Sequence, residues 1–134
     1  MSTKIFVNLP VKDLNRSVAF FSKLGYSFNQ QFTDENATCM IVGEDIYVML
    51  LVEPFFKTFT PKPIADAKSS TEVLVSLSAE SRDDVNRIVE TAFAAGARRY
   101  KEPMEHGPMY GWGFEDLDGH IWEYIWMDPA AIQG

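Results

Sequence analysis

Glu123 is a single carboxylate in the middle of a predicted apolar strand. It belongs to the stretch DLDGHIWEYIW, in which an Asp-Gly turn signal precedes residues that alternate like a β-strand. Because successive strand side chains point to opposite faces, Glu123 shares a face with Ile121 and Ile125. Both faces are apolar, and an unpaired carboxylate is costly to bury. We therefore expect a metal, a cation, hydrogen-bond donors or a wet cavity at Glu123. A structural glutamate bonded to a neighbouring Arg, Lys or amide is the alternative.

Aromatic residues form a second group of candidates. Tyr110, Trp112 and Phe114 share one face of a predicted strand whose other face carries glycines. Glycines inside a strand let another group approach the backbone closely. Either face could line a ligand pocket together with Phe6 and Asn8, and a packed aromatic core is the alternative. Phe6, Asn8, Tyr110 and Trp112 are therefore candidate ligand-binding residues.

The histidine and cysteine residues are weaker candidates for a functional site. His106 lies in a turn-rich loop that could overhang a cavity, and His120 falls on the strand face opposite Glu123. We expect both imidazoles to be solvated or hydrogen-bonded, and a contact between His106 and a ligand stays open. The single Cys39 excludes an internal disulfide and a cysteine-based zinc site.

The elements that must position these residues occur twice in the same order. The first copy is a strand, a helix between Asp13 and Gly25, and three more strands, over residues 5–11, 26–32, 37–42 and 46–52. The second copy is a strand, a helix between Ser81 and Gly96, and three more strands, over residues 72–77, 97–101, 108–114 and the stretch around Glu123. Internal repetition of this kind predicts an α+β fold of two similar modules.

Residues 1–134 are the size of one domain and can bury a core. The modules are assigned to residues 1–53 and 72–128, with residues 54–71 as a proline-rich joint. This joint carries Phe55, Phe56 and Phe59, which a solvated linker would not. We expect a lid, a plug for the core or a subunit contact, and Phe56 is a further candidate for the pocket.

Composition narrows the classes of partner. Hydrophobic residues make up 46% of the chain, as in globular proteins. A net charge of -7 without a basic cluster excludes nucleic acid as an expected partner. No apolar run is long enough to span a membrane, and the N-terminus lacks a secretion signal. A cytoplasmic location is therefore the expectation.

Two stretches carry a resemblance to a known group. FVNLPVKDLNRS, from Phe6 to Ser17, resembles the opening strand and helix of the vicinal oxygen chelate superfamily. That superfamily includes glyoxalases, bleomycin-resistance proteins and extradiol dioxygenases. DLDGHIWE, from Asp116 to Glu123, is similar to its closing D-x-D-G-x-x-x-E. The chain is most similar to the members labelled predicted lactoylglutathione lyases.

The resemblance implies two βαβββ modules whose curved sheets enclose a cavity. In metal-dependent members four side chains hold a divalent ion there. They are a His on the first strand, a Glu or Gln late in the first copy, a His opening the second copy and a Glu on the last strand. The ion binds two neighbouring oxygens of the substrate and stabilises an oxyanion intermediate.

At most two of these four ligands are carried over to this chain. Glu123 matches the last-strand Glu, whereas Phe6 stands at the first-strand His. The ligand late in the first copy falls on Met49 or Leu50, neither of which offers oxygen. The position that opens the second copy falls on Glu72 or on the residue after it. Two carboxylates alone would bind a hard cation weakly.

Two functions from different classes remain open. One is a superfamily protein of undetermined activity that binds a small molecule in a cavity without the standard metal ligands. The other is a metal-dependent lyase or isomerase, related to lactoylglutathione lyase, on a small oxygenated or thiol-conjugated substrate. In the second, Glu123 is a ligand or general base, with Glu72 the further possible metal ligand. We expect no cofactor, and the resemblance implies a homodimer.

Overall fold

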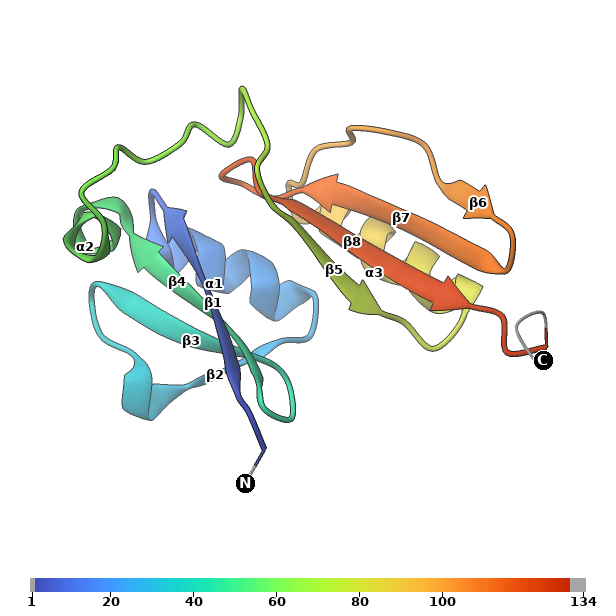
Figure 1. Ribbon diagram of the computed structural model, residues 1–134, viewed down its shortest axis with the longest axis horizontal. Helices are drawn as coiled ribbons and strands as arrows, with labels where there is room; N and C mark the ends of the chain where they lie inside the picture. The colour runs from blue at the N-terminus through green and yellow to red at the C-terminus, as the bar shows by residue number, and fades with distance from the viewer. Residues whose placement is uncertain (1, 131–134) are drawn as a thin grey trace. The chain divides into compact units, whose positions relative to one another are not determined.

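The computed structural model describes residues 2–130 and confirms the α+β repeat (Figure 1). The chain divides into two compact units, Met1–Ala65 and Asp66–Gly134, called unit 1 and unit 2 below. Each unit builds one four-stranded mixed sheet and carries its helix between the first and second strands. No helix within the described residues is long and apolar enough to cross a membrane.

Unit 1 begins with a strand and a helix that Gly25 ends with a φ of 102°. In its sheet the order is β1-β4-β3-β2, with β1 parallel to β4 and the other pairs antiparallel. Its elements are β1 (Ile5–Val11), α1 (Leu14–Lys23), β2 (Ser27–Asn29), η1 (Gln30–Phe32), β3 (Ala37–Gly43), β4 (Ile46–Val52), α2 (Glu53–Phe56) and η2 (Lys57–Phe59).

Unit 2 repeats this plan, and Gly96 ends its helix with a φ of 112°. The sheet order is β5-β8-β7-β6, again with the first pair parallel and the others antiparallel. Its elements are β5 (Leu74–Ser78), α3 (Arg82–Ala94), β6 (Met104–His106), β7 (Met109–Glu115) and β8 (Ile121–Met127).

Side-chain caps fix where both helices begin. The Asp13 carboxylate accepts a hydrogen bond from the Arg16 backbone N–H at 3.1 Å. In unit 2 the Ser81 hydroxyl accepts from the Asp84 N–H at 3.0 Å, while Asp84 accepts from the Glu80 N–H at 3.1 Å. These two bonds form a variant of the capping box, in which the Asp84 carboxylate accepts from the residue before the N-cap.

Two predicted strands of the second copy are placed differently. Residues 97–101 form no strand, and only Arg98 bridges to Glu115. The outer strand is β6, which contains His106 and pairs with β7. The opening strand begins at Leu74, so Glu72 lies before it and is exposed.

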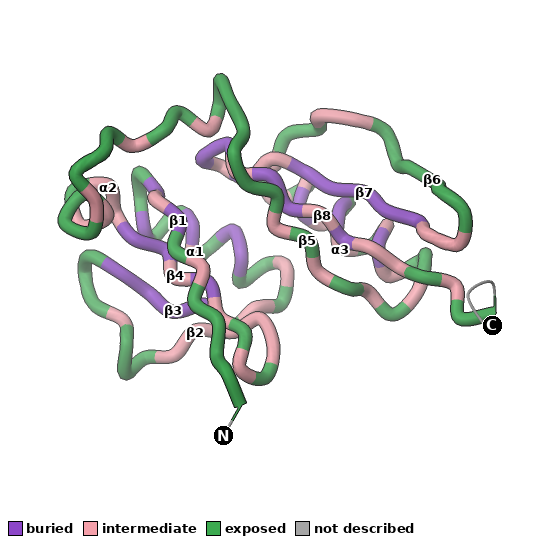
Figure 2. Tube along the Cα trace, viewed as in Figure 1, coloured by how far each residue is buried: buried purple, intermediate pink, exposed green. Residues whose placement is uncertain are grey.

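Within each unit the helix lies against one face of the sheet (Figure 1). Phe93 of α3 packs edge-on against Trp112, which pairs with Tyr124 in the sheet. Trp122 and Tyr124 are buried on this face. Buried stretches run along β7 and β8 (Figure 2). Because strand side chains alternate, Glu123 lies on the opposite face, called the helix-free face below.

Candidate functional site

Glu123 lies in the middle of β8, with Ser76 of β5 on one side and Gly113 of β7 on the other. Its Oε1 accepts a hydrogen bond from the Ser76 hydroxyl at 3.1 Å. Its Oε2 accepts one from the Tyr100 hydroxyl at 3.0 Å, and the Lys101 ammonium lies 3.6 Å from the same oxygen. The Glu123 carboxylate is thus compensated by two hydroxyl donors and one lysine cation of the protein.

Tyr100 reaches Glu123 because position 113 has no side chain. A Cβ on Gly113 would lie 3.0 Å from the Tyr100 hydroxyl and 2.2 Å from the Trp122 carbonyl oxygen. A Cβ on Gly111 would lie 2.7 Å from the Ile125 Cδ1 atom. The groups that approach these glycines are therefore neighbours within unit 2.

Burial and charge make Tyr100 a poor acid. Its pKa is raised above the ordinary 10.0, first by burial and then by its hydrogen bond to Glu123. The phenol therefore stays protonated at neutral pH and acts as a donor to the carboxylate. The side chain of Glu123 is 15% exposed and that of Lys101 is 36% exposed, so the ammonium is the more accessible end of the pair.

Tyr110 and Trp112 lie on the face that α3 covers, apart from Glu123. The Tyr110 hydroxyl donates to Asn86 Oδ1 at 2.5 Å, and the Arg82 guanidinium lies 4.2 Å from its ring centroid. Trp112 donates its indole N–H to the Lys101 carbonyl at 3.1 Å. Both aromatics are less than a tenth exposed, so the structure places them in the packed core of unit 2.

Phe6 and Asn8 share the helix-free face of unit 1. The Phe6 ring stacks on Tyr47 at 5.0 Å and is 49% exposed. The Asn8 side-chain amide donates to the Phe6 carbonyl at 3.2 Å. Glu72, named from the sequence as a further possible metal ligand with Glu123, lies before β5 and is exposed. Within residues 2–130 it is not among the hydrogen-bond or ion-pair partners of Glu123.

A hollow of about 390 Å³ lies in unit 1, and it brings Asn8 of β1 together with residues of the joint. Its lining residues are Asn8, Leu51, Phe56, Phe59 and Thr60. Leu51 pairs with Pro10 on β1, on the same face as Asn8. The short helices α2 and η2 carry the two phenylalanines, and Phe59 packs edge-on against Phe55 at 5.2 Å. Sequence reasoning named Asn8 and Phe56 but missed Leu51, Phe59 and Thr60 as a lining.

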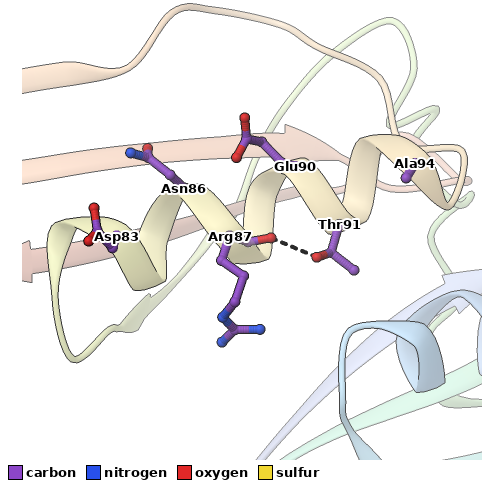
Figure 3. A pocket seen from close by; sticks show the side chains of 6 residues that line it. All are labelled: Asp83, Asn86, Arg87, Glu90, Thr91 and Ala94. Carbon is purple, nitrogen blue, oxygen red and sulfur yellow. Dashed lines mark hydrogen bonds between the residues drawn. The ribbon is translucent and has the colours of Figure 1, made fainter.

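The outer face of α3 carries an open depression of about 620 Å³ (Figure 3). It is lined by Asp83, Asn86, Arg87, Glu90, Thr91 and Ala94, which recur at helical spacing. Thr91 donates its hydroxyl to the Arg87 carbonyl at 2.7 Å, within the helix itself. Charges of both signs and an internal hydrogen bond are typical of the solvated side of an amphipathic helix.

Asp116 has a structural role at the Asp-Gly turn. It is buried, and its pKa is raised, chiefly by that burial. Oδ1 accepts from the backbone N–H groups of Asp118 and His120, and Oδ2 accepts from the Trp122 indole at 2.9 Å. These bonds fix the turn and the first residues of β8.

The donor groups do not fit the divalent metal that the resemblance implies for some relatives. The sheet register puts Met49, which pairs with Asn8, on the helix-free face of unit 1, and Phe6 lies on that face too. Neither side chain offers an oxygen or an imidazole. Within residues 2–130, no three His, Cys, Asp or Glu side chains gather as a metal site. At Glu123 the Lys101 ammonium already supplies positive charge.

Comparisons with known proteins agree with this fold. A family model described as bleomycin resistance protein-like N-terminal matches residues 3–43. A hypothetical protein from S. aureus is 28% identical, with a TM-score of 0.79 over 93% of this chain and 94% of that one. No curated protein matches the chain.

Two further solved structures share the fold at lower identity. One, from Burkholderia phytofirmans, is described as a glyoxalase/bleomycin resistance protein/dioxygenase family enzyme. It is 15% identical, with a TM-score of 0.81 over 94% of this chain and 99% of that one. The fosfomycin resistance protein FosX from Listeria monocytogenes is 18% identical, with a TM-score of 0.67 over 94% and 93%. By its N-terminal family match and its two-module fold, the chain is similar to proteins of the glyoxalase/bleomycin resistance/dioxygenase superfamily.

Proposed function

We propose that the chain binds a small, largely apolar or aromatic molecule without a bound metal, and that the hollow of unit 1 holds it. The observation that carries the proposal is the lining of that hollow. Three apolar side chains, Leu51, Phe56 and Phe59, surround two polar ones, Asn8 and Thr60. Ligand pockets typically combine apolar walls with a few polar groups, at volumes of roughly 300–1,000 Å³.

The polar groups of the hollow have hydrogen-bonding capacity left for a ligand. Asn8 uses one amide hydrogen on the Phe6 carbonyl, and its side-chain oxygen can still accept. The Thr60 hydroxyl accepts from the Lys62 backbone N–H at 3.2 Å and can still donate. A flat ring between the phenylalanines, with one polar substituent, fits this lining.

The similar proteins support a small-molecule ligand. The matched family model is named for bleomycin resistance, and FosX is named for fosfomycin resistance. A metal-dependent lyase or isomerase is the less supported alternative, since Phe6 and Met49 replace two of its ligands. In that alternative Glu123 would serve as ligand or base, but its two oxygens already accept from Ser76 and Tyr100.

Indole is a suitable first probe for the hollow. We expect saturable shifts of backbone amide signals around Phe56 and Phe59 when indole is titrated into ¹⁵N-labelled protein. Phe56→Ala or Phe59→Ala should weaken binding about tenfold, the effect of losing roughly 1.4 kcal/mol of stacking and burial. Phe32→Ala is the matched control, because Phe32 is an exposed phenylalanine of the same unit outside the hollow. Equal weakening in this control, or no saturation, would show the proposal to be wrong.

We also propose a homodimer in the cytoplasm. The sheet of each unit has an edge strand, β1 or β5, with exposed apolar side chains such as Ile5 and Leu74. The segment Phe55–Phe59 is a further candidate contact. Light scattering at micromolar concentration should give twice the chain mass, and a mass near 15.2 kDa would contradict the dimer.

A further inference from the structure

The ammonium of Lys101 forms an ion pair with Glu123 but keeps its hydrogen-bond donors available. We propose that it forms a second ligand site, in unit 2, for the planar acceptor oxygen of a carbonyl or carboxylate group. This site is separate from the hollow of unit 1 and does not depend on it.

Lys101 is positioned by charge alone. Its Nζ lies 3.6 Å from Glu123 Oε2 and 5.7 Å from the centroid of the Tyr100 ring. Neither distance is that of a hydrogen bond, and within residues 2–130 the ammonium makes none. Three N–H donors are therefore available, on a side chain that is 36% exposed.

Glu123 does not need those donors. Its two oxygens already accept from the hydroxyls of Ser76 and Tyr100. The raised pKa of Tyr100 keeps that hydroxyl protonated, so the donor to Oε2 persists through the neutral range. The carboxylate thus fixes the position of the ammonium and leaves its hydrogen-bonding capacity for another molecule.

The charges of the pair select the ligand class. Glu123 and Lys101 together carry no net charge, so a phosphate dianion gains little from the ammonium and is repelled by the carboxylate. A divalent cation is repelled by the ammonium. A carbonyl or singly charged carboxylate needs only a strong donor, which Lys101 supplies.

Acetate and acetamide are the probes, titrated separately into ¹⁵N-labelled protein at constant ionic strength. We expect a saturable shift of the Lys101 ¹⁵Nζ signal and of the backbone amides at 100, 101 and 123. Saturation with acetate alone identifies a carboxylate site, and saturation with both identifies a carbonyl-oxygen site. Lys101→Met should weaken the binding at least tenfold, whereas Lys101→Arg should keep it within a few-fold, because guanidinium also donates to planar oxygens.

Lys23→Met is the matched control, because Lys23 is an exposed lysine at the end of α1. The proposal is wrong if neither probe saturates, if folded Lys101→Met binds as wild type does, or if the Lys23 signal responds equally. If Lys101→Met is unfolded by circular dichroism, Lys101→Arg decides, since loss of binding in that folded variant contradicts the proposal. Indole binding reports on Phe56 and Phe59 instead, so the two proposals fail independently.

Discussion

The helix-free faces of the two units share a backbone plan but not their chemistry. In unit 1 the parallel pair β1 and β4 presents the Phe6–Tyr47 stack and, farther along, the hollow under α2 and η2. In unit 2 the parallel pair β5 and β8 presents Ser76 beside Glu123, with Tyr100 and Lys101 above them. One face is apolar and aromatic, and the other holds a carboxylate that accepts hydrogen bonds from two hydroxyls and forms an ion pair with Lys101.

The comparison shows that the two units share their topology, whereas the side chains on their helix-free faces differ. The helix side of each sheet must stay apolar, because it forms the core of its unit. The opposite face has no such constraint, so each unit can carry a different kind of binding group. Substitutions in unit 2 should therefore separate the parts that are built around Glu123 from parts that serve the fold alone.

Gly113→Ala should have the largest effect. The added methyl would lie 2.2 Å from a backbone carbonyl oxygen and 3.0 Å from the Tyr100 hydroxyl, so the strand pair itself would have to shift. We expect a loss of about 3 kcal/mol in the free energy of unfolding, at the upper end for overpacking. Urea denaturation measures it. Gly43→Ala is the control, since its methyl meets only the Ile46 side chain, at an ordinary 3.5 Å or more. An equal loss of stability there would refute the explanation.

The Tyr100–Glu123 hydrogen bond should be measurable as a coupling free energy in a double-mutant cycle of unfolding. Tyr100→Phe and Glu123→Gln are each expected to cost about 1 kcal/mol of stability, because the first removes the neutral donor and the second the charged acceptor of a half-buried hydrogen bond. The double variant should lose about 1 kcal/mol less than the sum of the two. Strict additivity in the double-mutant cycle would contradict the coupling.

Stability at high pH should depend on the same bond. The folded pKa of Tyr100 is raised above its unfolded value near 10, so its contribution is complete below pH 10 and is lost as pH rises further toward the folded pKa. Wild type should therefore lose stability above pH 10 more steeply than Tyr100→Phe. Urea denaturation at a series of pH values tests this, and parallel curves for the two proteins would count against it.

The smallest effect is expected at the capping box of α3, which serves the fold alone. Asp84→Ala should cost about 0.5–1 kcal/mol by removing the acceptor for the Glu80 N–H. The Arg87 hydrogen bond, followed by that from Glu80, lowers the pKa of Asp84 below 3.8. Its contribution is thus present above pH 3.8 and is lost as pH falls through the lowered pKa. A difference from wild type that persisted at pH 2 would contradict this origin.

Much of the fold follows from local signals in the sequence. The caps at Asp13 and Ser81 and the closing glycines Gly25 and Gly96 mark both helices. Alternation around Glu123 places its carboxylate away from the helix. These features depend on neighbours in the chain, so a single sequence contains them.

The partners of Glu123 could not be read in the same way. Tyr100 and Lys101 lie in a connection that was predicted as a strand, and side-chain directions in a connection follow from tertiary packing rather than from a period. Alternation also could not tell which face of β7 the helix covers, so Tyr110 and Trp112 were candidates for a pocket. One signal was present, because Gly113 leaves room beside Glu123 for a third group.

The central claim is that a small apolar molecule binds without a metal. Calorimetric titration of indole before and after exhaustive treatment with EDTA tests it most directly. We predict the same affinity in both samples, and unchanged affinity in Glu123→Gln. Binding that disappears with the chelator and returns with zinc, nickel or manganese would contradict the claim, most clearly if the metal were stoichiometric and absent from Glu123→Gln.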